Sequence, residues 1–327
     1  MLKKLVESLK ANQKRLVYTE GTDSRILEAA SRLHKEGLLV PILVGEPGAV
    51  KKAAADAGQE IDGIEIVDPN NYAGFDAMVE KMTELRRGKM TAEECAKLLH
   101  KANYFGTMYV KMGYADALLG GATYSTADTV RPALQIIKTR PGSKIVSSCF
   151  ILDRVGADGK PERYAMGDCA INLKPTADEL VEIAAETANT ASFFGIEPKV
   201  ALLSYSTLGS GKGEDVDRVH EAAEKLKSID FAYPVDGEMQ FDAAFSPEVA
   251  KTKAKDSPVA GKANTFIFPD INAGNIGYKI AQRLGGFEAV GPILQGLAAN
   301  INDLSRGCNA EEVYKMSIIT AGLNAQG

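Results

Sequence analysis

The 327-residue sequence contains no tryptophan, only four cysteines and no long apolar segment. No apolar run approaches the roughly 20 residues of a membrane-spanning helix, and the charged N-terminal stretch lacks the apolar centre of a signal peptide. The cysteines form no C-x-x-C pair and no metal-site spacing, which favours reduced thiols in a cytoplasmic protein. The net charge of -5 argues against nucleic-acid binding, which requires a dense basic surface.

Two nucleotide-binding signatures are also absent. The segment GSGKG (209–213) is close to a Walker loop, but Gly213 follows Lys212 where Ser or Thr is required, and Ser206 stands in place of the first glycine. No G-x-G-x-x-G follows the first expected strand, which counts against a dinucleotide-dependent dehydrogenase.

Short apolar, β-branched segments alternate with helical segments along most of the chain. We predict strands at 15–20, 39–46, 65–69, 199–207, 264–270 and 289–294. We predict helices at the N-terminus and at 26–37, 49–58, 175–195 and 310–321, a helical region from about 74 to 112, and a hairpin or loop at 154–163. Glycine-ended helices between such strands indicate parallel βαβ units, hence an α/β protein with a mostly parallel sheet in each of two lobes.

In sheets of this kind the ligand binds beyond the carboxyl ends of the strands. The loop 204–211 follows a buried strand, and its Ser206 and Thr207 hydroxyls and backbone amides suit an oxyanion. The segment 258–279 places Lys262, Asn264 and Asn275 around another strand, which suits the close approach of a large polar ligand. An ordinary polar turn in the first case, and a turn plus a helix cap in the second, remain alternatives.

Two arginine positions are candidates for phosphate binding. Arg131 directly precedes Pro132 at an expected loop-to-helix start, where its planar guanidinium can meet phosphate in a bidentate manner. Arg86 and Arg87 lie near the end of a helix, and there a favourable interaction with the helix dipole is the alternative explanation.

The segment 302–315 has the most informative spacing. Ser305 and Arg306 lie in a loop before the last helix, where a hydroxyl and a guanidinium could together hold an acyl phosphate. Asn309 is the expected N-cap, so Glu312 falls at the third helical position of a capping box. From spacing alone, this structural role of Glu312 is the favoured one.

These motifs resemble the successive signature blocks of phosphate acetyltransferases, in the family's order and over essentially the whole chain. The segments are STADTVRPALQIIKT, LSYSTLGSGKG, PVDGEMQFDAA, SPVAGKANTFIFPDINAGNIGYK and INDLSRGCNAEEV. The related phosphate butyryltransferases share the fold but resemble the sequence less closely. A two-domain metal- or NAD-dependent dehydrogenase and a non-catalytic module, like the phosphotransacetylase-like tails of some malic enzymes, are the alternatives from other classes.

The resemblance implies two three-layer α/β domains facing each other across a cleft. The first would comprise 1–145 plus 300–327, because the last helix returns to it, and the second 146–299. The resemblance also implies a homodimer. No residue type in the sequence demands a bound metal or redox cofactor, so we expect no metal and no permanently bound cofactor. By the same resemblance, the substrates would be coenzyme A, acetyl phosphate and inorganic phosphate, and transfer would occur in a ternary complex without an acyl-enzyme.

Site residues follow from the same resemblance. Ser305 and Arg306 match the family's active-site serine and arginine, and Arg86 and Arg131 match its substrate-binding arginines. Glu312 occupies the position of the proposed thiol base, where the family usually has aspartate. The chemistry requires a coenzyme A thiolate, from a thiol of pKa near ~8.5, and donors for the carbonyl oxygen as it becomes an oxyanion.

Overall fold

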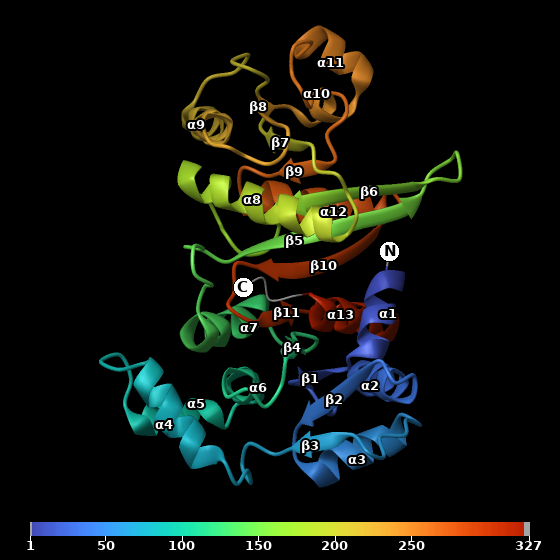
Figure 1. Ribbon diagram of the computed structural model, residues 1–327, viewed down its shortest axis with the longest axis vertical. Helices are drawn as coiled ribbons and strands as arrows, with labels where there is room; N and C mark the ends of the chain where they lie inside the picture. The colour runs from blue at the N-terminus through green and yellow to red at the C-terminus, as the bar shows by residue number, and fades with distance from the viewer. Residues whose placement is uncertain (1, 324–327) are drawn as a thin grey trace. The chain divides into compact units, whose positions relative to one another are not determined.

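The βαβ pattern at the start of the chain folds into an all-parallel sheet. The structure is a computed structural model that describes residues 2–323, and it divides into two units (Figure 1). Unit 1 comprises the chain up to Gly142 and from Leu297 onward, and unit 2 comprises Ser143–Gly296. Within the described residues, the sheet of unit 1 has the order β11 (Asn300–Asp303), β4 (Ala117–Gly120), β1 (Lys14–Tyr18), β2 (Leu39–Val44), β3 (Glu65–Val67).

Side chains alternate along β1 and so place helices on both faces of this sheet. The Tyr18 hydroxyl donates to Ser317 Oγ of α13 (Ala310–Gly322) at 2.7 Å. The neighbouring Val17 faces α6 (Ala102–Lys111), where Gly106 lies so close that a Cβ there would come within 3.1 Å of Val17. Unit 1 is therefore the three-layer α/β unit that the sequence predicts. Its other helices are α1 (Lys3–Ala11), α2 (Ser24–Lys35), α3 (Pro47–Asp56), α4 (Phe75–Leu85), α5 (Ala92–Leu99), α7 (Thr126–Pro132) and the π-helical turn Ala133–Ile137.

The predicted helical region 74–112 is divided into α4, α5 and α6. Gly88 adopts a φ of +76° after α4 ends, a conformation that glycine reaches without steric cost. Thr91 and Glu94 then form a capping box that begins α5. The composition predicts the helices, whereas the breaks depend on local signals that the prediction overlooked.

Unit 2 combines parallel and antiparallel pairing in one six-stranded sheet within the described chain. The strand order is β10 (Glu288–Gln295), β5 (Ser147–Val155), β6 (Pro161–Gly167), β9 (Thr265–Ile267), β7 (Val200–Leu203), β8 (Val235–Met239). β6, β9, β7 and β8 pair in parallel, and β10, β5 and β6 pair antiparallel. The hairpin expected at 154–163 is confirmed as the β5–β6 turn, which Gly156 N closes by donating to Lys160 O at 2.7 Å.

Helices cover both faces of this second sheet as well. On one face Ile183 of α8 (Ala177–Phe193) and Val219 of α9 (Glu214–Ser228) pack with Leu202 in one buried cluster. On the other face Phe266 and Phe150 form a second cluster with Tyr278 of α12 (Ile271–Arg283). The short helices α10 (Phe241–Phe245) and α11 (Pro247–Lys253) complete the unit.

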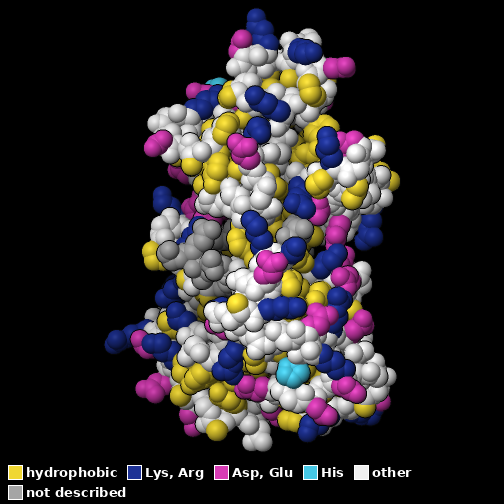
Figure 2. All heavy atoms as spheres, turned by 45° about the vertical axis from the view of Figure 1, so that its right-hand side comes forward, with side chains coloured by type: hydrophobic (Ala, Val, Ile, Leu, Met, Phe, Trp, Pro, Cys, Tyr) yellow, Lys and Arg dark blue, Asp and Glu magenta, His cyan; other side chains and the backbone are white. Residues whose placement is uncertain are grey.

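The surface bears charges of both signs. On the face drawn in Figure 2, Lys and Arg side chains are interspersed with Asp and Glu, and no continuous basic surface is visible there. None of the described helices combines the length and apolar character needed to span a membrane.

Candidate active site

The carboxyl ends of the unit 1 strands surround a pocket of about 670 Å³. The strand order reverses between β1 and β4, which is where open parallel sheets leave a crevice for ligands. The pocket walls come from loops after β1, β2 and β4 and from the starts of α6 and α7. The lining residues are Thr19, Glu20, Gly21, Thr22, Asp23, Val44, Gly45, Ala102, Asn103, Thr123, Tyr124 and Asp128.

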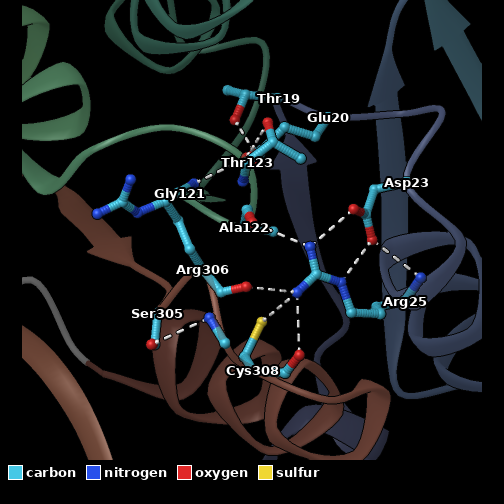
Figure 3. A network of polar contacts seen from close by, with 11 residues as sticks. Thr19, Glu20, Asp23, Arg25, Gly121, Ala122, Thr123, Ser305, Arg306 and Cys308 are labelled. Atoms are coloured by element: carbon cyan, nitrogen blue, oxygen red, sulfur yellow. Dashed lines mark hydrogen bonds and ion pairs between the residues drawn. The ribbon is translucent and has the colours of Figure 1, made fainter.

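The predicted Ser305–Arg306 loop follows β11 at the same edge of this sheet. Leu304 N donates to Gly120 O at 2.7 Å, which ties the end of β11 to the end of β4. A tight turn follows, because Cys308 N donates to Ser305 O at 2.9 Å and Gly307 N donates to Ser305 Oγ at 3.3 Å. Ser305 and Arg306 are both exposed. No partner within residues 2–323 pairs with the Arg306 guanidinium, whose end points away from the contacts drawn in Figure 3.

The structure brings Arg86 and Arg131 to one place. Burial raises the pKa of Tyr104, and the positive charges of Arg131 and Arg86 act on the same hydroxyl in the opposite direction. Arg131, on α7, is exposed. Arg86 follows α4, and its Nε is buried without a hydrogen-bond partner in the described part of the chain. A buried, unsatisfied guanidinium nitrogen is costly unless a ligand supplies an acceptor.

Glu312 forms the capping box that the sequence predicts. Glu312 N donates to Asn309 Oδ1 at 2.9 Å, and Asn309 N donates to Glu312 Oε2 at 3.0 Å, at the start of α13. Only one carboxylate oxygen is used in this way. The other, Oε1, has no hydrogen-bond partner among the residues that the structure describes.

In unit 2 the Ser206 and Thr207 hydroxyls are turned inward. Ser206 is 0% exposed; its Oγ donates to Glu238 Oε1 and accepts from Gly211 N, both at 2.8 Å. Thr207 is 5% exposed, and its Oγ1 accepts from Gln240 N at 3.0 Å. The two hydroxyls thus serve as internal supports of the loop 204–213, which presents Tyr205 and Leu208 to solvent instead.

The remaining unit 2 candidates differ in accessibility. Asn264 bridges two backbone segments, because its Oδ1 accepts from Lys199 N and its Nδ2 donates to Glu197 O, both at 2.8 Å. Asn275 of α12 donates to Cys169 O at 3.1 Å. Lys262 is exposed and lines a second, smaller pocket of about 440 Å³ beside α11.

Two acidic side chains that the sequence analysis did not select lie beneath the loops of unit 1. Burial raises the pKa of Asp303 to about 6, although Thr126 and Thr129 each donate to it at 2.6 Å. Burial also raises the pKa of Glu20, which accepts from the backbone N–H groups of Gly121 and Thr123. For Glu20 the available sequence signal was its place at the end of the predicted strand 15–20, since ligand sites lie at strand carboxyl ends. Asp303 had no such signal, because β11 was not predicted.

All four cysteines are buried. Burial raises the pKa of Cys149 and Cys169 far above the ordinary value and that of Cys308 to about 11. These three thiols are therefore protonated at neutral pH and are poor nucleophiles. In residues 2–323 no three His, Cys, Asp or Glu side chains are grouped as a metal site would need.

A pocket at a parallel-sheet switch point defines an α/β protein with a ligand site at the carboxyl ends of its strands, and Glu20, Asp23 and Asp128 are the charged residues that line it. Known proteins specify the class further. A family profile described as "Phosphate acetyl/butaryl transferase" matches residues 1–321. The chain therefore belongs to this family.

Individual relatives match over nearly their whole length. A phosphate acetyltransferase of Bacillus subtilis is 51% identical over 315 residues, which cover 96% of each chain. The crystal structure of a phosphotransacetylase from Streptococcus pyogenes superposes with a TM-score of 0.92 at 53% identity, covering 98% of this chain and 96% of that one. A branched-chain phosphotransacylase from Enterococcus faecalis shares the fold at 20% identity, with a TM-score of 0.69 and coverage of 95% and 99%.

Proposed function

We propose that this chain catalyses the reversible transfer of an acetyl group between acetyl phosphate and the thiol of coenzyme A. The observation that carries this proposal is the 51% identity to a phosphate acetyltransferase over 96% of both chains. Butyryl transfer is the closest alternative, because discrimination of one or two methylenes by a hydrophobic pocket is worth only about 1–3 kcal/mol each.

A direct assay tests the activity and the acyl preference together. Purified protein is incubated with coenzyme A and either acetyl phosphate or butyryl phosphate, and thioester formation is followed by absorbance. We expect kcat/KM for acetyl phosphate to exceed that for butyryl phosphate by at least about tenfold. Thioester formation from neither substrate would refute the proposal, and a preference for butyryl phosphate would reassign the substrate.

In the proposed mechanism the coenzyme A thiolate attacks the acetyl carbonyl directly. Glu312 accepts the S–H proton through Oε1, the oxygen that the capping box leaves free. The new S–C bond forms while the carbonyl becomes an oxyanion, which Arg306 and the Ser305 hydroxyl stabilise. The C–O bond to phosphate then breaks, and the departing phosphate keeps the bonding pair and takes the proton from Glu312. It leaves as HPO₄²⁻, which returns Glu312 to its carboxylate form.

The guanidiniums of Arg86 and Arg131 would hold phosphate or the charged arm of coenzyme A. The unsatisfied Nε of Arg86 supports this role, because a bound phosphate oxygen would supply its missing acceptor. In unit 2 the predicted contacts for the rest of coenzyme A lie at opposite ends of the strands. Asn275 and the loop of Ser206 and Thr207 follow β9 and β7, whereas Lys262 and Asn264 precede β9. Lys262, the exposed member, is the one able to pair with a phosphate group.

Direct transfer predicts that no cysteine carries the acetyl group. Cys308 lies next to the Ser305–Arg306 turn but is buried, with a pKa raised to about 11. We expect Cys308→Ala to retain kcat within about threefold of the wild type, because no bond to sulfur forms. Mass spectrometry of protein quenched during turnover is the complementary measurement; acetyl-cysteine at any of the four positions would contradict direct transfer.

We further propose a cytoplasmic homodimer, as the family resemblance implies. The subunit mass is 34.9 kDa, so light scattering on the purified protein should give twice that value. A mass equal to one subunit at micromolar concentration would contradict the dimer without affecting the proposed reaction.

A further inference from the structure

Arg25, the second residue of α2, makes more polar contacts in unit 1 than its position on a helix requires. Its Nη1 donates to the carbonyl oxygens of Arg306 at 2.9 Å and Cys308 at 3.0 Å. Its Nη2 donates to the carbonyl oxygen of Ala122 at 2.9 Å. Figure 3 shows the guanidinium at the centre of this network, between the loop after β4 and the turn after β11.

Asp23 fixes the guanidinium in this position. Its carboxylate accepts from Arg25 Nε at 3.0 Å and from Nη2 at 2.8 Å, a bidentate pairing that fixes the plane of the guanidinium. The same carboxylate caps α2 by accepting from Arg25 N at 3.0 Å. Both side chains are largely shielded, with 26% of Arg25 and 14% of Asp23 exposed. The Arg25 side chain is therefore held in one orientation at the start of α2, since the helix cap and the ion pair constrain the same two residues.

The contacts of Arg25 fall on the backbone of the turn that carries the proposed catalytic groups. Ser305 and Arg306 belong to this turn, and the Arg306 carbonyl that Arg25 binds is attached to the Cα that bears the Arg306 side chain. On the opposite side, Glu20 accepts from Gly121 N at 3.2 Å and from Thr123 N at 2.9 Å. Glu20 and Arg25 together hold the loop after β4 by the backbone groups of three consecutive residues, so this loop cannot shift away from the turn without breaking these bonds.

We propose that Arg25 is a positioning residue for acyl transfer, which holds the Ser305–Cys308 turn so that the hydroxyl and guanidinium on it face the reacting acyl phosphate. This inference rests on the proposed function and on the roles of Ser305 and Arg306 in it. Arg25 itself does not touch the reacting atoms. Displacement of a catalytic group by about 1 Å can cost about 100-fold in rate, so its loss should affect turnover more than substrate binding.

Arg32 provides a matched control on the same helix. It also ties α2 to α13, because Nη1 donates to Glu311 at 2.7 Å and the guanidinium stacks 3.6 Å from the centre of the Tyr314 ring. Within the described residues, Arg32 forms no hydrogen bond or ion pair with the turn at 305–308 or with the loop at 121–123. Arg32→Ala therefore removes a comparable helix attachment and leaves the turn untouched.

The test compares Arg25→Ala, Arg25→Lys and Arg32→Ala by kcat, KM and Tm, with the wild type first shown to form acetyl-coenzyme A. We expect kcat to fall about 100-fold for Arg25→Ala while KM stays within about threefold. Lysine retains the charge but not the fork, so Arg25→Lys should lie between alanine and the wild type. Millimolar guanidinium chloride should restore part of the activity of Arg25→Ala. Arg32→Ala should lower Tm and leave kcat within about twofold.

Other outcomes would overturn the inference. A kcat within threefold of the wild type for Arg25→Ala would do so, and so would a loss of activity that matches Arg32→Ala at equal loss of Tm. If Arg25→Ala does not fold, Asp23→Asn decides, because asparagine still caps the helix but weakens the ion pair; an unchanged kcat there removes the positioning role, and a fall of about tenfold supports it. An inactive wild type would instead refute the proposed function.

Discussion

The two units build the same three-layer architecture but use the polar groups after their strands in opposite ways. In unit 1 the loops after β1, β4 and β11 are fixed by partly buried groups such as Glu20 and Arg25, and the guanidiniums of Arg131 and Arg306 have no hydrogen-bond partner among residues 2–323. In unit 2 the loop after β7 is held by Glu238 of β8, which accepts hydrogen bonds from the Ser206 hydroxyl and from Gly209 N. A polar loop after a strand thus carries the proposed reactive groups in unit 1, whereas in unit 2 its side chains hold its own backbone.

The hydrogen-bond partners that a polar side chain already has therefore indicate better than its residue type whether it can bind a ligand or only supports the fold. A hydroxyl with a donor and an acceptor already in place gains little from a ligand, whereas an unpaired guanidinium gains a charge-assisted bond. The experiments below test that distinction, beginning with the largest expected effect.

Arg306→Lys should have the largest effect, because lysine keeps the charge but loses the planar fork that holds an acyl phosphate at two points. We expect kcat to fall about 100- to 1,000-fold with little change in KM. Arg131→Lys is the matched control in the same unit, and there KM for the phosphate-bearing substrate should rise more than kcat falls. Near-normal turnover by Arg306→Lys in steady-state kinetics would remove Arg306 from the mechanism.

Glu312 both supports the fold and keeps a group available for catalysis, because one carboxylate oxygen caps α13 and the other has no partner in residues 2–323. Glutamine can also cap at this position but cannot accept a proton, so Glu312→Gln should reduce kcat at least about 100-fold with little change in Tm. Glu312→Asp should remain active, because it keeps a carboxylate at this position. Activity of the glutamine variant within a few-fold of the wild type would show that Glu312 only caps α13.

The buried Asp303 carboxyl, which ties β11 to α7, should make the free energy of unfolding depend on pH. Its folded-state pKa of about 6 lies above the ordinary 3.8, so the folded protein holds this proton more tightly than the unfolded chain. The contribution of this proton to the free energy of unfolding is fully present below pH 3.8 and is lost as pH rises through about 6. The total loss is about 3 kcal/mol.

Asp303→Asn removes this dependence. We expect the stability of the variant relative to the wild type to increase from pH 4 to pH 7, as measured by urea unfolding. Asp128→Asn is the control with the opposite sign, because the Ser125 hydroxyl lowers the pKa of Asp128 and that contribution is lost as pH falls. A flat difference between Asp303→Asn and the wild type would show that the pKa of Asp303 is the same in the folded and the unfolded protein.

Ser206→Ala should give the smallest effect on catalysis. Its removal leaves Gly211 N–H and a Glu238 oxygen short of a partner in a buried place, which costs about 1–3 kcal/mol of stability. We expect Tm to fall while kcat and KM stay within a few-fold. Ser210→Ala, at an exposed position of the same loop, should be milder, because water can replace the hydroxyl. A rise of KM for coenzyme A above about tenfold in Ser206→Ala would return the Ser206 hydroxyl to the binding site.

The sequence was most informative where a local signal repeats. Helical periodicity and glycine stops predicted α2, α3 and α8, and the capping-box spacing predicted the Asn309–Glu312 bonds at the start of α13. The strands β4, β8 and β11 were not predicted, because their sequences ALLG, VDGEM and NIND contain at most one β-branched residue each and so lack the composition typical of a strand. β11 matters most among them, since it delivers the Ser305–Arg306 turn to the sheet.

The sequence by itself determined the α/β class and the family, and it selected Arg86, Arg131 and Arg306 as candidates, because these conclusions depend on composition, periodicity and long motifs. Only the tertiary structure decided which polar groups remain available. Ser206 and Arg306 both lie in loops after strands. The Ser206 hydroxyl bonds to Glu238, 32 residues away, whereas the Arg306 guanidinium has no partner in the described chain. Arg25 likewise reaches the carbonyl of Arg306 across 281 positions. Such pairings exist only once parallel strands bring distant loops to one edge of a sheet, and no local pattern encodes them.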